Sequence, residues 1–127
     1  AVIGKWHISH PANEMHPIWH GVDHYMGILT GSVMAYDNWN KTENNITTNS
    51  NDYITSYLTN DAINWIDNQN NPWFLWLAHV APHTPLHIPP ASMHTQIFTN
   101  SPIRKYMAMI ESLDYEVGRL LNSLTPS

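Results

Sequence analysis

The chain has 127 residues, of which 43% are hydrophobic and 12% are charged, and its formal net charge is −5 at pH 7. So many hydrophobic residues and so few charges predict one packed globular domain and exclude a disordered chain. Ten acidic residues against five basic ones leave no basic stripe for phosphates, and no apolar run approaches the roughly 20 residues that span a bilayer, so neither a nucleic-acid partner nor a membrane span is expected.

The first half of the chain predicts short strands joined by loops. Residues 1–7 are apolar at first and polar at the end, which predicts a short strand. The stretch 9–31 is rich in His, Pro and Gly, and these residues predict a loop rather than a helix. A second short strand is expected at 33–36. The polar, Asn-rich stretch 37–51 then predicts an excursion over the surface.

The second half predicts two helices around one buried strand. Asn51 or Asp52 can cap a helix that runs to about residue 68, because its apolar residues follow helical spacing. Residues 73–78 are continuously apolar, which is typical of a strand buried on both faces. Ser101-Pro102 opens a helix that reaches about residue 124. Its predicted core-facing residues are Ile103, Tyr106, Met107, Ile110, Leu113, Val117, Leu120, Leu121 and Leu124.

Strands separated by long helices predict an α/β layered fold, with a parallel or mixed sheet and flanking helices. Ligands of such sheets lie just beyond the carboxyl ends of the strands, where Lys5 and His7 stand. Side chains two apart on a strand point to the same face, so both would enter one site while Trp6 packs on the other side. Lysine offers a compact cation for an anion, and histidine can move a proton. A surface lysine beside a structural histidine fits the same pattern, and spacing alone favours that interpretation.

A second set of polar groups, His79-Val80-Ala81-Pro82-His83-Thr84-Pro85, follows the predicted buried strand. Its place at a strand end matches that of Lys5 and His7, and prolines hold its loop. His79 lies close to the strand and is expected to be a half-buried structural histidine. His83 stands between two prolines and is better placed to reach a ligand, although spacing alone again favours a structural role.

Nine histidines also prompt a zinc hypothesis. Two sets of three are spaced four residues apart: His16, His20 and His24, and His79, His83 and His87. On an uninterrupted helix each set would line one face and could bind zinc. Prolines and glycines interrupt both sets, so this stacking fails and no dedicated zinc site is expected.

Four ordered blocks of sequence nearly span the chain. They are Gly4-Lys5-Trp6-His7, residues 16–17 with 21–27, residues 73–78 with 81–85, and residues 106–110 with 113–121. Together they resemble the sulfatase family, within the alkaline-phosphatase-like superfamily. Only the Asn-rich stretch 37–51 has no counterpart in the resemblance.

The resemblance implies a fold and a chemistry. Residues 1–127 would be an internal portion of a sulfatase catalytic domain with part of the alkaline-phosphatase-like layered fold. Family members cleave sulfate esters with a formylglycine made from Cys or Ser, beside a divalent cation that is usually Ca²⁺. By position, Lys5 and His7 would contact the sulfate and the formylglycine hydroxyls. His83 would contact the sulfate or the leaving oxygen and would be the general acid.

The chain also departs from the family pattern. It has no Cys and no Cys/Ser-x-Pro-x-Arg motif, which the family places before the Gly-Lys-Trp-His strand. The Asp ligands of the cation and the later Asp-Asn pair are missing too, and Ile8-Ser9 replaces the usual Leu-Gly. The resemblance therefore implies that the nucleophile and every metal ligand lie outside this chain, and that the isolated chain is inactive. The absence of an initiating Met and the apolar start are likewise expected of an internal piece.

The implied substrate is a sulfated small molecule or a sulfated glycan, in a periplasmic, secreted or lysosomal setting. Two alternatives stay open. A phosphoester or phosphonate hydrolase of the same superfamily would carry a Thr or Ser nucleophile in place of the formylglycine precursor. A non-catalytic carbohydrate-binding module would expose its Trp side chains on one flat face, whereas the sequence predicts that Trp73 and Trp76 belong to a buried strand.

Overall fold

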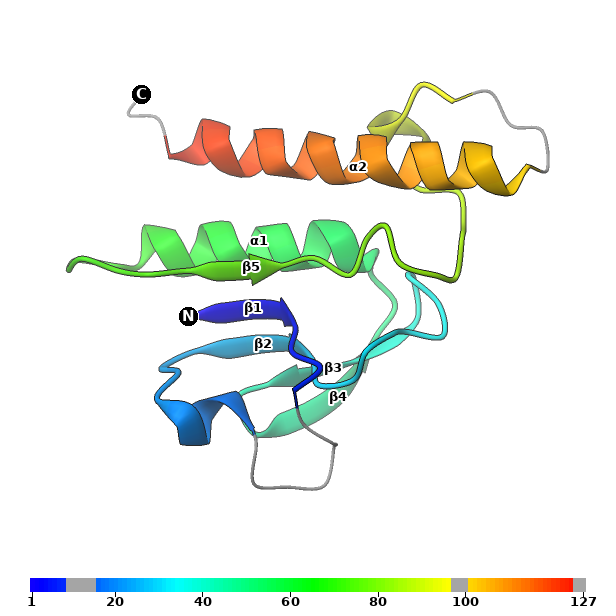
Figure 1. Ribbon diagram of the computed structural model, residues 1–127. Helices are drawn as coiled ribbons and strands as arrows, with labels where there is room; N and C mark the ends of the chain where they lie inside the picture. Colours follow the sequence, from blue (N-terminus) through cyan, green and yellow to red (C-terminus); the bar gives the residue numbers. More distant parts are fainter. Residues whose placement is uncertain (9–15, 97–100, 125–127) are drawn as a thin grey trace.

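The computed structural model describes residues 1–8, 16–96 and 101–124 as a five-stranded sheet with helices on one side (Figure 1). The strands are β1 (Val2–Lys5), β2 (Tyr25–Ile28), β3 (Trp39–Glu43), β4 (Ile46–Ser50) and β5 (Trp76–Ala78). The helices are α1 (Ile54–Asp67) and α2 (Pro102–Ser123), and two 3₁₀ turns are η1 (Pro17–His20) and η2 (Ala91–Met93). No helix in these ranges is long and apolar enough to cross a membrane.

The sheet is mixed, with the strand order β4-β3-β2-β1-β5. Strand β1 runs parallel to both β2 and β5, whereas β3 pairs antiparallel with β2 and with β4. Helix α1 packs on the sheet and α2 packs on α1, so the helices form two successive layers (Figure 1). The predicted α/β layering with a mixed sheet is therefore confirmed.

Close contact between three strands depends on Gly4. Gly4 pairs with Gly27 on one side and with Ala78 on the other. A Cβ at Gly4 would lie 1.9 Å from the Ala78 carbonyl oxygen, and one at Gly27 would lie 1.8 Å from the Gly4 carbonyl oxygen. The φ angle of Gly4 is +115°, a region that glycine tolerates and other residues rarely adopt. The packing of the sheet therefore requires glycine at position 4, the first residue of the Gly-Lys-Trp-His block.

We expect Gly4→Ala to lower the free energy of unfolding by about 3 kcal/mol or more, because the backbone of β5 would have to move. Gly118→Ala is the matched control: nothing lies within 4 Å of the added Cβ, and alanine favours the helix by up to about 1 kcal/mol. Urea unfolding of both variants measures the difference. A Gly4→Ala protein as stable as Gly118→Ala would contradict the strand packing described here.

Both predicted helices are present, but their details differ from the predictions. Helix α1 begins at Ile54 after Tyr53, not after Asn51 or Asp52. The Asp52 carboxylate accepts a hydrogen bond from Ser50 Oγ instead, at 3.1 Å. Helix α2 matches its predicted range, yet it buries Ala108, Met109, Ser112 and Glu116 rather than most of the predicted stripe.

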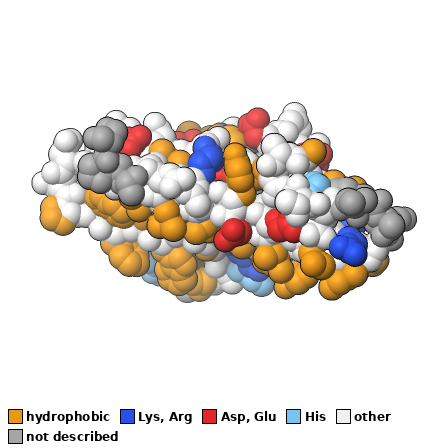
Figure 2. All heavy atoms as spheres, turned by 90° about the horizontal axis from the view of Figure 1, so that it is seen from above, with side chains coloured by type: hydrophobic (Ala, Val, Ile, Leu, Met, Phe, Trp, Pro, Cys, Tyr) orange, Lys and Arg blue, Asp and Glu red, His pale blue; other side chains and the backbone are white. Residues whose placement is uncertain are grey.

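The outer face of α2 carries hydrophobic side chains that the sequence predicts to be in the core. Figure 2, which views the molecule from the α2 side, shows hydrophobic side chains at this surface between scattered charged ones. The exposed members of the predicted stripe are Ile103, Tyr106, Met107, Ile110, Val117, Leu121 and Leu124. Small and polar residues, Ala108 and Ser112, face α1 instead, since they let the two helices approach closely.

The predicted strand at 73–78 is wrong in length and in burial. Strand β5 covers only the last three residues and lies at the edge of the sheet. The side chains of Trp73, Phe74 and Trp76 are 44%, 74% and 54% exposed. A continuous apolar run does not reveal how many faces of a strand are covered, because that depends on its neighbours in the sheet.

The polar stretch 37–51 lies at the surface as predicted, and it forms a β-hairpin at the edge of the sheet in which most β4 side chains are exposed. Side-chain hydrogen bonds across β3 and β4 support it, for example between Thr42 Oγ1 and Thr47 Oγ1 at 2.9 Å. Residues 33–36 belong to a loop, whereas the predicted loop at 9–31 contains η1 and β2. Residues 9–15 of that predicted loop lie outside the described residues. Strand β2 is fully buried, so it lacks the alternation that identifies half-exposed strands.

Candidate functional site

The carboxyl ends of β1, β2 and β5 lie at the same edge of the sheet, because the three strands are parallel (Figure 1). Lys5 ends β1, His7 follows two residues later, and His83 lies in the loop after β5. The loop at 29–38 leaves the same edge after β2. Ligands of open α/β sheets are bound at this kind of edge. The topology therefore brings the three predicted site residues to one side of the molecule.

Lys5 is the last residue of β1 and is half-buried. Its backbone pairs with Ile28 in the ladder between β1 and β2. Within the described parts of the chain, its ammonium group makes no hydrogen bond and no ion pair with a carboxylate. A fixed strand end thus presents a positive charge that is available to an anion.

His7 is not part of the strand, so the predicted alternation through residues 5–7 does not position it. Strand β1 ends at Lys5, and His7 has a φ angle of +51°, in the left-handed region. Its backbone N–H donates to the Leu29 carbonyl at 3.1 Å. Its ring lies against Gly31, where a Cβ would come within 2.4 Å of ring atoms. The loop after β2 holds His7 in this strained conformation, which is a feature often found at functional sites.

His83 is exposed in the loop between Pro82 and Pro85, and two hydrogen bonds fix its backbone. Its N–H donates to the Val80 carbonyl at 3.0 Å, and the Tyr36 hydroxyl donates to its carbonyl at 2.7 Å. Nδ1 of its ring lies 2.9 Å from the Thr84 carbonyl oxygen. A carbonyl only accepts, so Nδ1 carries a proton and Nε2 is the nitrogen that remains for a ligand.

Tyr36 belongs to a cluster of rings beneath the His83 loop that the sequence does not reveal. The Tyr36 and His87 ring centroids are 4.0 Å apart, and His87 Nε2 lies 3.1 Å from the Tyr53 hydroxyl oxygen. That hydroxyl is 3.2 Å from Ser112 Oγ on α2. Burial raises the pKa of the Tyr36 hydroxyl, which therefore stays protonated and able to donate. The cluster ties the loop of His83 to both helices.

The loop at 29–38 contacts both histidines of the predicted site. Gly31 lies against the His7 ring, and the hydroxyl of Tyr36 holds the carbonyl of His83. Neither residue stands out in the sequence, because a glycine in a loop and a lone tyrosine are common. The sequence instead predicts a short strand at 33–36, so it gives no sign that Tyr36 supports a loop.

His79 is a half-buried histidine next to β5, as its place in the sequence predicts. Thr59 Oγ1 donates to the Thr55 carbonyl at 3.2 Å and lies 3.4 Å from His79 Nε2, so Nε2 is the protonated nitrogen. Nδ1 is buried and has no hydrogen-bond partner in the described residues. Burial lowers the pKa of His79 to about 4, and the nearby Glu116 opposes this only in part.

The lowered pKa of His79 makes the stability of the protein depend on pH. The unfolded chain takes up a proton near pH 6.5, whereas the folded chain resists it down to about pH 4. The stabilisation is therefore complete above pH 6.5 and is lost as pH falls towards 4, by up to about 3 kcal/mol. Urea unfolding between pH 7.5 and 4.5 should show a smaller loss in His79→Leu than in the wild type. Equal losses in the two proteins would contradict this account.

Across residues 1–8, 16–96 and 101–124, no three His, Asp or Glu side chains lie close enough together to hold a metal ion. The two histidine sets considered for zinc are dispersed: His16 caps η1, His24 pairs with Asp61 at 3.0 Å, and His87 contacts tyrosines. These residues do not fit the calcium ion that the family resemblance implies.

Comparison with known proteins decides the family. The model of the family described as "Sulfatase" matches residues 1–127, which is the whole chain. The chain belongs to the sulfatase family. The resemblance of the four sequence blocks is thereby confirmed.

Curated sulfatases and solved structures agree with this membership. The chain is 28% identical over 151 residues to "Uncharacterized sulfatase YdeN" of Escherichia coli (strain K12), covering 98% of this chain and 27% of that protein. It is 26% identical over 146 residues to N-acetylgalactosamine-6-sulfatase of Mus musculus, covering 97% and 26%. The crystal structure of Ps i-CgsB in complex with k-i-k-neocarrahexaose matches with a TM-score of 0.80 at 26% identity, covering 97% and 33%.

The sulfatase structures share the layered α/β architecture described above, so the predicted fold class is confirmed for this chain. The chain spans about a quarter to a third of the length of the sulfatases it matches. In this sulfatase-family chain, the Gly-Lys-Trp-His block forms β1 and its end, and the Ala-Pro-His-Thr-Pro block forms the loop after β5.

Proposed function

We propose that the complete protein is a sulfuric ester hydrolase and that this chain supplies one wall of its active site. Membership of the sulfatase family supports the reaction class. The observation that carries the proposal is that Lys5 ends β1, while His7 and His83 lie in the segments that follow β1 and β5, two strands that pair in parallel. A lysine and two histidines are the groups needed to hold a sulfate and to move a proton.

Lys5 and His7 are proposed to bind the sulfonyl oxygens. Negative charge on these oxygens grows as the ester bond breaks, and donors that are already fixed stabilise that charge without reorganising. Lys5 is fixed by the sheet, and His7 is fixed by its hydrogen bond to Leu29 and its contact with Gly31. The backbone of Lys5 and the ring of His7 therefore have the support that such a role requires.

His83 is proposed to be the general acid. In this role the imidazole enters the step doubly protonated. When the bond between sulfur and the leaving oxygen breaks, the proton on Nε2 passes to that oxygen, which departs as an alcohol, and the ring is left neutral with its remaining proton on Nδ1. Nδ1 donates to the Thr84 carbonyl and so orients the ring, while Tyr36 holds the backbone. A proton donor matters most when the leaving group is a sugar alkoxide, because such an alkoxide is a poor leaving group.

The nucleophile and the cation are proposed to lie outside this chain. Formylglycine would supply the attacking oxygen and Ca²⁺ would offset sulfate charge, as the family resemblance implies. This chain has no Cys, and its described residues offer no cluster that fits Ca²⁺. We therefore expect the 127-residue chain on its own to be inactive.

A sulfated glycan is the proposed class of substrate. One relative is named for N-acetylgalactosamine 6-sulfate, and one solved structure contains k-i-k-neocarrahexaose. Both identities are below 30%, so they support a sulfated sugar and not a particular one. A sulfated small molecule is the alternative.

The test is to assay the complete protein with 4-nitrophenyl sulfate and with 4-nitrophenyl phosphate. We expect sulfate release with a kcat/KM at least about tenfold above that for the phosphate, which corresponds to about 1.4 kcal/mol of discrimination. The reverse preference would make the protein a phosphoester hydrolase.

Binding of sulfated sugars without any hydrolysis would favour the carbohydrate-binding alternative, for which the exposed Trp73 and Trp76 are the specific observation. These two side chains offer apolar rings to solvent, and sugars stack on such rings. Trp73 also packs edge-on against Trp65, at 5.9 Å between ring centroids, so part of its surface already has a structural use. Catalysis remains the proposal that the family supports.

A further inference from the structure

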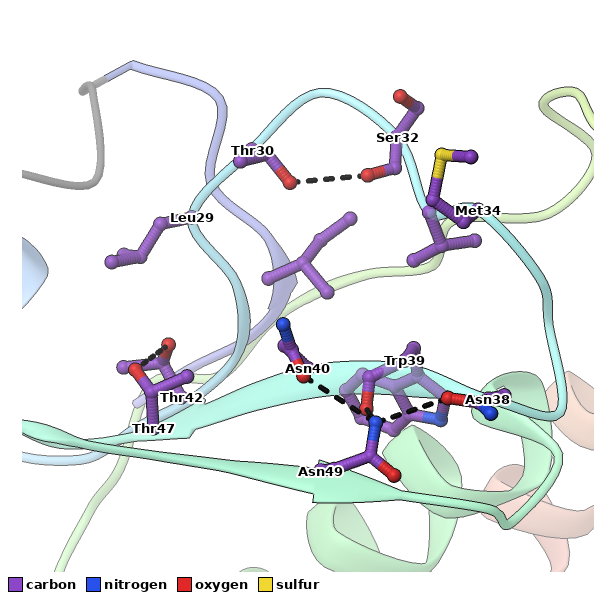
Figure 3. Close-up of a pocket in the computed structure, with 12 residues that line it drawn as sticks. Leu29, Thr30, Ser32, Met34, Asn38, Trp39, Asn40, Thr42, Thr47 and Asn49 are labelled. Atoms are coloured by element: carbon purple, nitrogen blue, oxygen red, sulfur yellow. Dashed lines mark hydrogen bonds between the residues drawn. The ribbon is translucent and has the colours of Figure 1, made fainter.

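A pocket of about 560 Å³ lies between the loop after β2 and the β3–β4 hairpin. Its volume is within the range of about 300–1,000 Å³ that is usual for small-molecule sites. Figure 3 shows Leu29, Thr30 and Met34 of the loop on one side, and Asn38, Asn40 and Asn49 of the hairpin facing them. The pocket is therefore built by two segments that lie close together only in the folded chain.

The chemistry of the pocket is uncharged and rich in hydrogen-bonding groups. All twelve lining residues are neutral, and they combine three asparagine amides and four hydroxyl groups with apolar side chains such as Leu29, Val33 and Met34. Asn49 Nδ2 donates within the hairpin to Asn38 Oδ1 at 3.0 Å. Among the described residues, Asn40 Nδ2 makes no such bond, and Figure 3 shows it directed into the pocket. Amides and hydroxyls beside apolar patches suit a ligand with many hydroxyl groups and no charge.

The pocket adjoins the proposed sulfate site through the loop after β2. Leu29 lines the pocket, and its carbonyl accepts the hydrogen bond from the backbone N–H of His7. Gly31, which touches the His7 ring, stands between Thr30 and Ser32 of the pocket lining. The proposed sulfate site and the pocket therefore share the loop after β2 as a common wall.

We propose that the pocket binds an unsulfated sugar ring that is linked to the ring bearing the sulfate. The proposal rests on the proposed function and specifies its substrate as an oligosaccharide rather than a small aryl sulfate. A neutral pocket beside Lys5 and His7 suits the two parts of such a ligand. The sulfate goes to Lys5 and His7, and the hydroxyl groups go to Asn40 and its neighbours. The residues that line this pocket include no cation that could bind a second sulfate.

The test compares Asn40→Ala with Asn45→Ala in the complete protein. Asn40 lines the pocket, whereas Asn45 is exposed at the tip of the same hairpin and outside this pocket. The probes are k-i-k-neocarrahexaose and 4-nitrophenyl sulfate. We expect Asn40→Ala to raise KM and the calorimetric Kd for the hexasaccharide about three- to tenfold, through the loss of one neutral hydrogen bond. The kcat/KM of Asn40→Ala for 4-nitrophenyl sulfate should stay within about twofold of the wild type. So should the KM and Kd of Asn45→Ala for the hexasaccharide.

An unchanged Kd for the hexasaccharide in Asn40→Ala would overturn the pocket while leaving the sulfatase proposal intact. Equal weakening by Asn45→Ala would also overturn it, since the effect would then belong to the hairpin as a whole. Hydrolysis of neither probe by the wild type would overturn the proposed function instead. Calorimetry would still test the pocket in that case, because binding does not require turnover.

Discussion

His83→Ala in the complete protein should lower kcat for a sugar sulfate by about 10² to 10⁴, because the leaving alkoxide would depart without a proton. The loss should be at least about tenfold smaller for 4-nitrophenyl sulfate, whose leaving group is stable as an anion. The hydrogen bonds from Tyr36 and to Thr84 hold the imidazole where this transfer requires it. Steady-state kinetics with both substrates measures the effect.

His20→Ala is the matched control for His83→Ala. His20 is also exposed, but it ends η1, before β2, and so lies away from the carboxyl edge of the sheet. We expect its kcat to stay within about twofold of the wild type, since it takes no part in the proposed chemistry. A loss at His83 that is equal for both leaving groups would show that His83 is not the general acid.

Lys5→Ala should lower kcat by about 10² to 10³, because one preorganised donor to the developing charge on the sulfonyl oxygens is removed. The side chain ends β1, and its ammonium has no carboxylate partner in the described parts of the chain. Lys5→Arg keeps the charge but changes its shape, so it should recover only part of the loss. The measurement is the kcat of the three proteins with one sulfate ester.

Lys41→Ala provides the control for charge alone. Lys41 lies on β3, and its ammonium donates to the Tyr57 hydroxyl at 2.5 Å. Lys41→Ala removes one positive charge, as Lys5→Ala does, but it leaves the proposed site unchanged. If Lys41→Ala lost as much activity as Lys5→Ala, the general field of the protein, and not a contact with sulfate, would explain both losses.

The sequence predicts the layers of the fold better than its surfaces. Helix α2 falls within one residue of its predicted range, because Ser101 and Pro102 mark its start and its hydrophobic residues follow a helical period. Which face of α2 is buried depends on Ala108 and Ser112, whose small side chains give a weak pattern. The prediction that residues 73–78 are buried is wrong for a related reason. Whether a strand lies in the middle or at the edge of a sheet depends on the other strands and not on its own sequence.

The sequence predicts candidate site residues after strands of the sheet, but it does not reveal the residues that support them. Lys5 ends β1 and His83 lies in the loop after β5, and the parallel pairing of these strands puts both residues beyond the same end of the sheet. His7 was placed by an alternation that ends at Lys5, and it reaches the same edge through a left-handed turn. Gly31 and Tyr36 hold the two histidines through contacts across distant parts of the sequence, which spacing along the chain does not encode.

The central claim is that Lys5, His7 and His83 surround one sulfate. A crystal structure of the complete protein soaked with a sulfated oligosaccharide tests it most directly. We predict that the sulfate oxygens and the ester oxygen lie within about 3.2 Å of Lys5 Nζ, a ring nitrogen of His7 and His83 Nε2. A sulfate group bound away from this edge of the sheet, with these three side chains untouched, would contradict the account.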